Sequence, residues 1–356
     1  YIASDKQEKE RIAEIIRLLY VKHLSPSITN RKVLLPPSQS AKGKYILGKV
    51  YYNEQEQSPF GLDDSDLKTH CAILGTTGAG KTNTVYTLAQ ELIRKNKQLG
   101  IIFFDWKKDY RALIADESLK RRFEIYTVGN SRIAPFKFNP LIPPDNCNPE
   151  DYAKQLIENI VGPSYLARDG SFAILSQAIM EMYKEYGVLD GTAKLYPTFR
   201  DLYWWAKKKY ADPQARKDSK LDWWKTTLRV LRELATGEMG RITSTQKRAD
   251  DLLGKRVIFE LNALSKKQKL FFIDAILWNM YLTYLEKTSN AEIAKNRLHT
   301  LFVIEEAHNM LKGFNDKSKN ETVVEILLRQ ARGIGLGILL VDQVPHLLNP
   351  VAMANV

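Results

Sequence analysis

Four short runs of nearly uninterrupted apolar residues recur along this chain. They occupy residues 100–105, 257–261, 301–304 and 338–341. Strands with one face in water alternate apolar and polar residues, whereas strands of a parallel sheet that is covered on both faces are apolar throughout. The runs therefore predict buried strands of a parallel sheet.

Helical patterns separate these runs. Apolar residues recur at helical spacing in segments 85–93, 175–183 and 324–331, and segment 270–285 is apolar almost throughout. Strands that alternate with helices imply right-handed crossover connections. We therefore expect an α/β fold in which helices flank a wound, mainly parallel sheet.

The N-terminal segment has a different pattern. Residues 4–23 predict an amphipathic helix that Ser4 and Gln7 would cap. Residues 31–60 combine Pro, Ser and Gly with short β-prone pieces. A helix followed by a small β element is therefore expected before the main sheet.

Residues 197–250 lack apolar strands and have a helical pattern, with Thr198 and Asp201 as a capping pair and Pro213 as a helix breaker. We expect an all-α insertion in the sheet-forming core. The predicted parts are an N-terminal helix and β element at 1–60, a first core part at 61–196, the insertion at 197–250 and a second core part at 251–356.

A complete Walker A pattern lies between the apolar run 71–74 and the helical segment 85–93, which is the strand–loop–helix context that this motif requires. It consists of Gly75, Thr76, Thr77, Gly78, Ala79, Gly80, Lys81 and Thr82, with Asn83 next. An ordinary glycine-rich turn would need neither the lysine nor the final threonine.

Each residue type in this pattern has a physical role. The glycines let successive backbone N–H groups face a triphosphate, and the following helix directs its positive end at the same point. Lys81 would reach the β- and γ-phosphates, and the Thr82 hydroxyl would bind Mg²⁺. Residues 75–83 are therefore expected to bind ATP.

Two adjacent acids, Glu305 and Glu306, end the apolar run 301–304. Ligands in open α/β sheets bind at the carboxyl ends of strands. We expect Glu305 to hold Mg²⁺, directly or through its waters, and Glu306 to activate the attacking water as a base. Gln343 ends the last apolar run and is expected to sense phosphate, with loop capping as the alternative; His308 has either a structural or a coupling role.

Arg329 and Arg332 lie three positions apart on one helical face. Either one could be an arginine finger that reaches a neighbouring subunit's γ-phosphate, which is a device worth about 10³–10⁵ in rate. A solvated or locally paired surface arginine is the alternative.

Charge favours a polyanionic partner. The chain has 53 basic and 41 acidic residues, a net charge of +12. Residues 197–256 hold 15 basic and 8 acidic residues and include the pairs Trp204-Trp205 and Trp223-Trp224. Such pairs either stack on nucleic-acid bases or form the core of a helical subdomain.

The remaining composition indicates a cytoplasmic setting. Cys71 and Cys147 are too few for a disulfide framework, and no run of about 18 apolar residues predicts a membrane span. Because the chain begins with Tyr1 and carries no signal-peptide pattern, we expect it to be part of a longer protein.

Together these motifs resemble the HerA/FtsK superfamily, and most closely its HerA-like members. The resemblance covers residues 46–356 and rests on segments 75–82, 104–110, 138–141, 305–308 and 329–343. It implies a RecA-like P-loop NTPase core of the ASCE type and a hexameric ring with ATP sites between subunits. It also implies transport of double-stranded DNA through a central pore.

Within the resemblance, Lys81 and Thr82 match the Walker A pair, Glu306 the catalytic glutamate, Gln343 the polar sensor, and Arg329 and Arg332 the finger region. The chain departs from the family where Glu305 replaces the usual Asp and where the segment 105–110 lacks its glycine. The family also continues beyond the equivalent of Val356, so further core strands and a C-terminal arm are expected.

The function expected first is an Mg²⁺-dependent ATPase motor that moves or remodels double-stranded DNA in repair, end processing or antiviral defence, with a nuclease or other effector as partner. A conjugation-type or type IV secretion ATPase that moves DNA or protein is the second candidate. An ATP-gated scaffold that activates an effector is the third. Lys107, Lys108 and residues 312–320 are candidate DNA contacts by loop position alone.

Overall fold

The computed structural model describes residues 42–52, 55–116, 119–120, 122–145, 147–165, 169–212, 221–290, 297–311 and 321–356. The helix expected at 4–23 lies outside these residues. The chain divides into two units, and most of the first unit's described residues form a two-stranded sheet of β1 (Tyr45–Tyr52) and β2 (Gln55–Leu62). This hairpin is the β element that the N-terminal pattern predicts.

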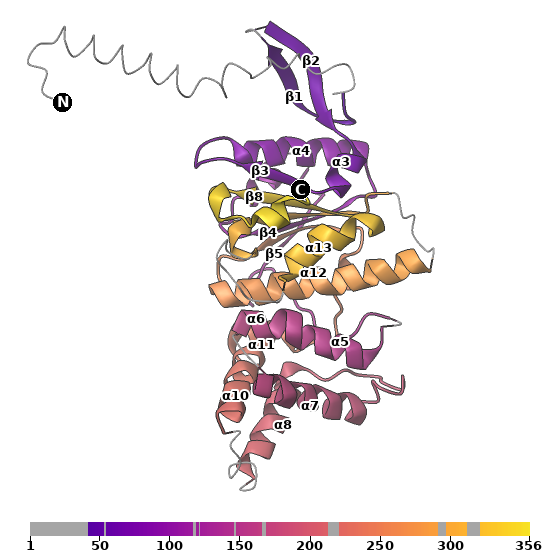
Figure 1. The fold of residues 1–356 in the computed structure, drawn as a ribbon, viewed down its shortest axis with the longest axis vertical. Coiled ribbons are helices and arrows are strands. Elements are labelled where there is room, and N and C mark those ends of the chain that lie inside the picture. Colours follow the sequence, from indigo (N-terminus) through magenta and orange to yellow (C-terminus); the bar gives the residue numbers. More distant parts are fainter. Residues whose placement is uncertain are drawn as a thin grey trace, which may run out of the picture. The chain divides into compact units, whose positions relative to one another are not determined.

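A six-stranded parallel sheet lies at the centre of the second unit (Figure 1), in the order β3-β8-β7-β4-β6-β5. The four apolar runs all become strands of this sheet, as predicted. The strands are β3 (Cys71–Leu74), β4 (Gly100–Asp105), β5 (Glu124–Thr127), β6 (Arg256–Glu260), β7 (Thr300–Glu305) and β8 (Leu336–Asp342).

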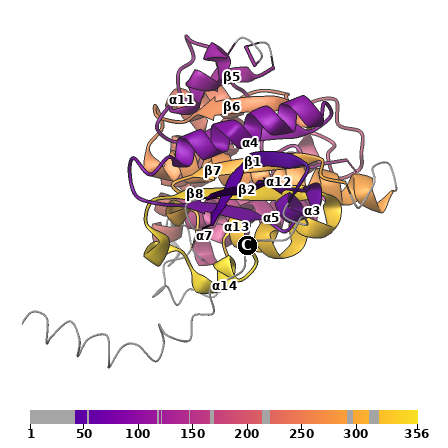
Figure 2. The ribbon, with the colours of Figure 1, turned by 90° about the horizontal axis from the view of Figure 1, so that it is seen from above.

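Helices cover both faces of this sheet, which explains why its strands are apolar throughout. On one face, α3 (Asp64–Lys68) and α4 (Lys81–Lys95) pack on side chains such as Ile101 and Phe103. On the other, α12 (Lys266–Ser289) and α13 (Val323–Gln330) pack on the alternate side chains, such as Phe104 (Figure 2). Because successive strand residues point to opposite faces, each strand contributes to two cores.

The α12 helix is apolar almost all round because it lies between the sheet and a further layer of helices (Figure 1). That layer comes entirely from the chain between β5 and β6, which contains no strand in its described part. It consists of α5 (Pro149–Gln155), the π-helical segment η3 (Leu156–Val161), α6 (Gly162–Tyr165), α7 (Asp169–Glu185), α8 (Phe199–Ala211), α10 (Leu221–Ala235) and α11 (Gly237–Thr243).

The helical layer therefore begins well before residue 197, where the sequence pattern placed the start of the insertion. The helix expected at 175–183 belongs to this layer and not to the strand–helix alternation of the sheet. The details of α8 agree with its sequence: Thr198 and Asp201 form a capping box, and the helix ends at Ala211, shortly before Pro213.

The two tryptophan pairs are each divided between core and surface. Trp205 and Trp224 stack on each other with ring centroids 6.2 Å apart. Their neighbours are exposed, Trp204 by 56% and Trp223 by 42%. The helical-core alternative therefore fits Trp205 and Trp224, whereas Trp204 and Trp223 are exposed.

His70, just before β3, is a buried histidine whose environment disfavours its charged form. It is buried, its Nδ1 accepts a hydrogen bond from the Ile338 backbone N–H at 3.1 Å, and its Nε2 has no partner among the described residues. Burial lowers the pKa of His70 to about 4, and the nearby Arg332 guanidinium acts in the same direction.

We expect the protein to lose stability as the pH falls from 6.5 towards 4, because the unfolded imidazole then binds a proton that the folded one does not. His70→Asn keeps an acceptor at the Nδ1 position and tolerates the left-handed backbone at φ 69°. Between pH 8 and pH 5, wild type should lose about 2 kcal/mol more than this variant. Urea denaturation at both pH values measures the difference, and equal losses would contradict the expectation.

Candidate active site

The Walker A segment forms the loop between β3 and α4. Gly78 and Gly80 have φ values of 81° and 89°, a left-handed conformation that other residues rarely adopt. The Nζ of Lys81 donates hydrogen bonds to the carbonyl oxygens of Gly75 at 2.8 Å and Thr76 at 2.9 Å. The ammonium therefore lies across the loop, where a phosphate can exchange with these carbonyls.

The order of the strands brings the other expected residues to the same edge of the sheet. The P-loop follows β3, Gln343 follows its neighbour β8, and Glu305 and Glu306 lie at the end of β7, the next strand. Asp105 ends β4, on the other side of β7. The carboxyl ends of four adjacent parallel strands thus meet in one site.

A chain of side-chain contacts runs from the P-loop to Glu306. The hydroxyl of Thr77 donates to Gln343 Oε1 at 2.6 Å, and Gln343 Nε2 donates to Glu306 Oε1 at 2.5 Å. On its other side, Glu306 forms an ion pair with Lys107, from the loop after β4. Gln343 therefore links the Walker A loop directly to the expected base.

Glu306 has a constrained backbone. Its φ and ψ of 48° and 47° place it in the left-handed region, which is unusual for a residue with a side chain. Its carbonyl oxygen accepts hydrogen bonds from the backbone and side-chain amides of Asn309 at 2.9 and 3.1 Å. His308 is held in turn by Asp342, whose Oδ2 lies 2.7 Å from the His308 backbone N and 2.9 Å from its Nδ1. Of the two roles expected for His308, structural or coupling, the observed hydrogen bonds fit the structural one.

Glu305 has a different environment from its neighbour. Its side chain is buried, and its Oε2 has no hydrogen-bond partner among the described residues. Burial, with the nearby Asp105 and Asp109 carboxylates, raises the pKa of Glu305 to about 8. A buried carboxylate oxygen without a partner, among other carboxylates, is suited to a divalent cation.

Such a cation would need further ligands, because the described residues contain no group of three or more His, Cys, Asp or Glu side chains placed to hold a metal. The Thr82 hydroxyl, at the start of α4, and the oxygens of a bound nucleotide are of the required type. The residues present therefore fit a metal that arrives with a nucleotide, with Thr82 and Glu305 on the protein side.

The loop after β4 is organised by Asp105. This buried carboxylate accepts backbone hydrogen bonds from Lys107, Lys108, Asp109 and Tyr110, at 3.1, 2.6, 3.1 and 3.0 Å. Lys108 stands where the family pattern has glycine, and it adopts φ 75°. The loop therefore keeps a left-handed conformation even though the glycine is absent.

The two arginines of the expected finger region lie ahead of β8, on the side of the sheet where the strands begin. Both precede β8, whereas Gln343 follows it, and a strand of seven residues is about 20 Å long. Arg329 forms an ion pair with Glu321, and Arg332 lies near His70. Both arginines thus precede the strand whose carboxyl end meets the P-loop, and a role in a neighbouring subunit's site stays a proposal.

Among the candidate DNA contacts, Lys107 and Lys108 lie on the loop after β4, and residues 312–320 lie outside the described residues. Sequence reasoning missed that Lys107 pairs with Glu306 and that Asp105 anchors the loop. No local sequence signal identifies the ion pair, because its partners come from different strands.

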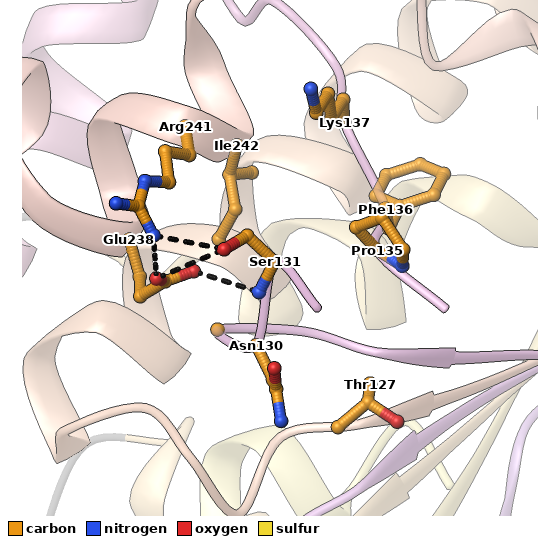
Figure 3. Close-up of a pocket in the computed structure, with 10 residues that line it drawn as sticks. Thr127, Asn130, Ser131, Pro135, Phe136, Lys137, Glu238, Arg241 and Ile242 are labelled. Carbon is orange, nitrogen blue, oxygen red and sulfur yellow. Dashed lines mark hydrogen bonds and ion pairs between the residues drawn. The ribbon is translucent and has the colours of Figure 1, made fainter. Parts of the chain in front are cut away.

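A small pocket elsewhere in the unit follows β5 (Figure 3), at the edge of the sheet farthest from β3. Its polar groups are largely satisfied internally: Glu238 accepts from the Ser131 backbone N–H at 3.0 Å, and Arg241 donates to the Ser131 hydroxyl at 2.9 Å. Its volume of about 10 Å³ suits a single water molecule. These contacts attach the loop after β5 to α11.

Residues 45–280 match the family model described as "Helicase HerA, central domain". A probable helicase of Methanocaldococcus jannaschii is 26% identical over 326 residues, covering 80% of this chain and 55% of that protein. The DNA double-strand break repair helicase HerA of Saccharolobus solfataricus is 24% identical over 292 residues, covering 80% of this chain and 52% of that protein. The chain thus spans about half the length of these curated relatives.

Solved structures share the fold. VirB4 of Thermoanaerobacter pseudethanolicus superimposes with a TM-score of 0.60 at 18% identity, covering 88% of this chain and 80% of VirB4. The plasmid coupling protein TrwB in complex with ADP and Mg²⁺ gives a TM-score of 0.52 at 12% identity, covering 86% and 72% of the two chains. The predicted RecA-like P-loop ATPase fold is confirmed. In the described part of the chain, no helix is both long and apolar enough to cross a membrane.

Proposed function

This chain belongs to the family of the HerA helicase central domain, and from that premise we propose that it hydrolyses ATP with Mg²⁺ to move or remodel double-stranded DNA. The observation that carries the proposal is the contact chain from Thr77 through Gln343 to Glu306. These contacts support the proposal, because they would bring the Glu306 carboxylate within reach of a nucleotide held by the P-loop.

The residues of the site divide the work of phosphoryl transfer. The N–H groups of residues 75–83 bind the phosphates, and the Lys81 ammonium moves from its carbonyl partners to the β- and γ-phosphates. Glu306 orients a water molecule and takes its proton as the oxygen bonds to the γ-phosphorus and the bond to the β–γ bridging oxygen breaks. Thr82 and Glu305 would hold Mg²⁺, which offsets the charge of the phosphate oxygens.

We further propose that the protein acts as a hexameric ring in the cytoplasm, in DNA repair, end processing or antiviral defence, with a nuclease or other effector. The placement of Arg329 and Arg332 away from their own P-loop supports a role for one of them in a neighbouring subunit's site. The net charge of +12 supports a polyanionic cargo.

DNA binding and its salt dependence test the cargo. We expect duplex DNA to stimulate ATP hydrolysis, and its affinity to fall steeply between 50 and 200 mM salt, roughly as expected for phosphate contacts. Fluorescence anisotropy with a labelled duplex measures the affinity. Absence of binding at low salt would contradict a DNA motor and favour a protein cargo.

Gln343→Ala tests the link between the P-loop and the base. We expect kcat to fall roughly 10- to 100-fold while ATP affinity changes little, because Glu306 loses the amide that orients it. Steady-state ATPase assays with nucleotide calorimetry measure both quantities. The matched control is Gln90→Ala, which removes a contact between exposed Gln90 on α4 and Asp116. An unchanged kcat in Gln343→Ala would show that the hydrogen bond has no catalytic role.

A further inference from the structure

In this structure one oxygen of the Glu306 carboxylate has two close partners. Its Oε1 accepts from Gln343 Nε2 at 2.5 Å and pairs with the ammonium of Lys107. Its Oε2 lies 3.7 Å from His308 Nδ1. An oxygen with two donors has little capacity left for water, and these two contacts, which come from the loops after both neighbours of β7, hold the direction of the carboxylate. Glu306 is therefore restrained in this arrangement.

The contact that restrains Glu306 comes from a partly exposed side chain, that of Lys107. The Lys107 side chain is 48% exposed, whereas that of Glu306 is 16% exposed. Asp105 holds the backbone N–H of Lys107, so only the long side chain is free to move. Glu306 occupies the left-handed region, so its orientation depends on the groups that surround it.

The strand order shows from which side the ammonium can be drawn away. The P-loop follows β3, separated from β7 by β8, whereas Lys107 follows β4, on the opposite side of β7. A nucleotide on the P-loop therefore approaches Glu306 from the side of Gln343. An anion that competes for the exposed Lys107 must come from the other side.

We propose that Lys107 is a positioning residue that restrains Glu306 and couples ATP hydrolysis to a nucleic-acid backbone. A phosphodiester group takes over the ammonium, and Glu306 becomes free to orient water. The inference rests on the proposed ATPase function and adds a way in which nucleic acid would regulate the rate of hydrolysis. It accounts for a lysine in contact with the expected catalytic base.

The test compares ATP hydrolysis by the intact protein with and without duplex DNA. In Lys107→Gln we expect the basal kcat to rise about three- to tenfold, since the lost restraint is a partly exposed ion pair. The KM for ATP should change less than about twofold, and the stimulation by DNA should fall to nearly none. Lys107→Arg, which keeps the charge, should retain a low basal rate and most of the stimulation.

Lys255→Gln is the matched control, because Lys255 is 44% exposed and pairs with Glu124, ahead of β6 at the other edge of the sheet. It should behave like wild type. Melting temperatures show whether each variant is folded. The proposal is wrong if Lys107→Gln keeps the wild-type basal rate and stimulation, or if its kcat falls with and without DNA.

The outcomes also separate this inference from the proposed function. Wild type that hydrolyses ATP, together with a Lys107→Gln variant that is stimulated equally, overturns the coupling alone. Wild type that hydrolyses no ATP under any condition overturns both. If nucleotide without DNA already gives full activity in wild type, the phosphodiester has no part in the release, and the coupling is again wrong.

Discussion

Replacing Lys81 by alanine is expected to weaken ATP binding by at least about 100-fold, which corresponds to nearly 3 kcal/mol. The Lys81 ammonium donates hydrogen bonds to the carbonyl oxygens of Gly75 and Thr76, both in the P-loop itself. Without it, the P-loop would bind the phosphates through its backbone N–H groups and would supply no positive side chain. Isothermal titration calorimetry with a non-hydrolysable ATP analogue measures the loss.

The control for this variant is Lys95→Ala, at the other end of α4, where the lysine pairs with Glu91. It should bind nucleotide as wild type does. Melting temperatures without nucleotide should differ little between wild type and Lys81→Ala, because only contacts within a partly exposed loop are lost. Wild-type affinity in Lys81→Ala would mean that the loop does not bind the triphosphate.

Replacing Glu306 by glutamine is expected to lower kcat roughly 10²- to 10⁴-fold while ATP affinity stays within a few-fold of wild type. Glutamine keeps the shape and can still contact Gln343, but it cannot take a proton from water. Glu306 contacts the P-loop indirectly, through Gln343, so the loss of its charge should spare nucleotide binding. Single-turnover hydrolysis measures the rate of the chemical step.

The matched control is Glu124→Gln, in an exposed carboxylate on β5 at the far edge of the sheet. Comparison of the two active-site variants also separates a motor from a scaffold. A motor loses its biological activity in both Lys81→Ala and Glu306→Gln. If Glu306→Gln remains active in cells and Lys81→Ala does not, nucleotide binding is the working step and hydrolysis is not.

Much of the fold follows from local pattern. The run 100–105 became β4, and all of its residues are buried, as a continuous apolar run predicts for a strand of a sheet covered on both faces. The Walker A loop could be identified from its residues alone, because its glycines and lysine act on neighbouring backbone atoms. Thr198 and Asp201 could be recognised as a cap for the same reason, since a capping box spans only four residues.

Other elements carried too little local signal. The strand β5 has four residues, is only partly buried and lies at an edge, so the pattern analysis missed it. The helix α7 has an apolar face like that of a sheet-covering helix, and its place in the helical layer follows from what it packs against. The tryptophan pairs show the same limit, since adjacent residues of a helix point in different directions and only Trp205 and Trp224 meet.

In the candidate site, too, some features follow from the sequence and others depend on the tertiary structure. The residue types, the phosphate loop and the two acids could be read from the chain, because each depends on its immediate neighbours. The different states of the acids could not: Glu305 has a buried oxygen without a partner, whereas Glu306 is held between Gln343 and Lys107. Parallel crossovers place strands side by side regardless of their separation in the chain. Only the tertiary structure therefore decides that Lys107, after β4, lies against Glu306, at the end of β7.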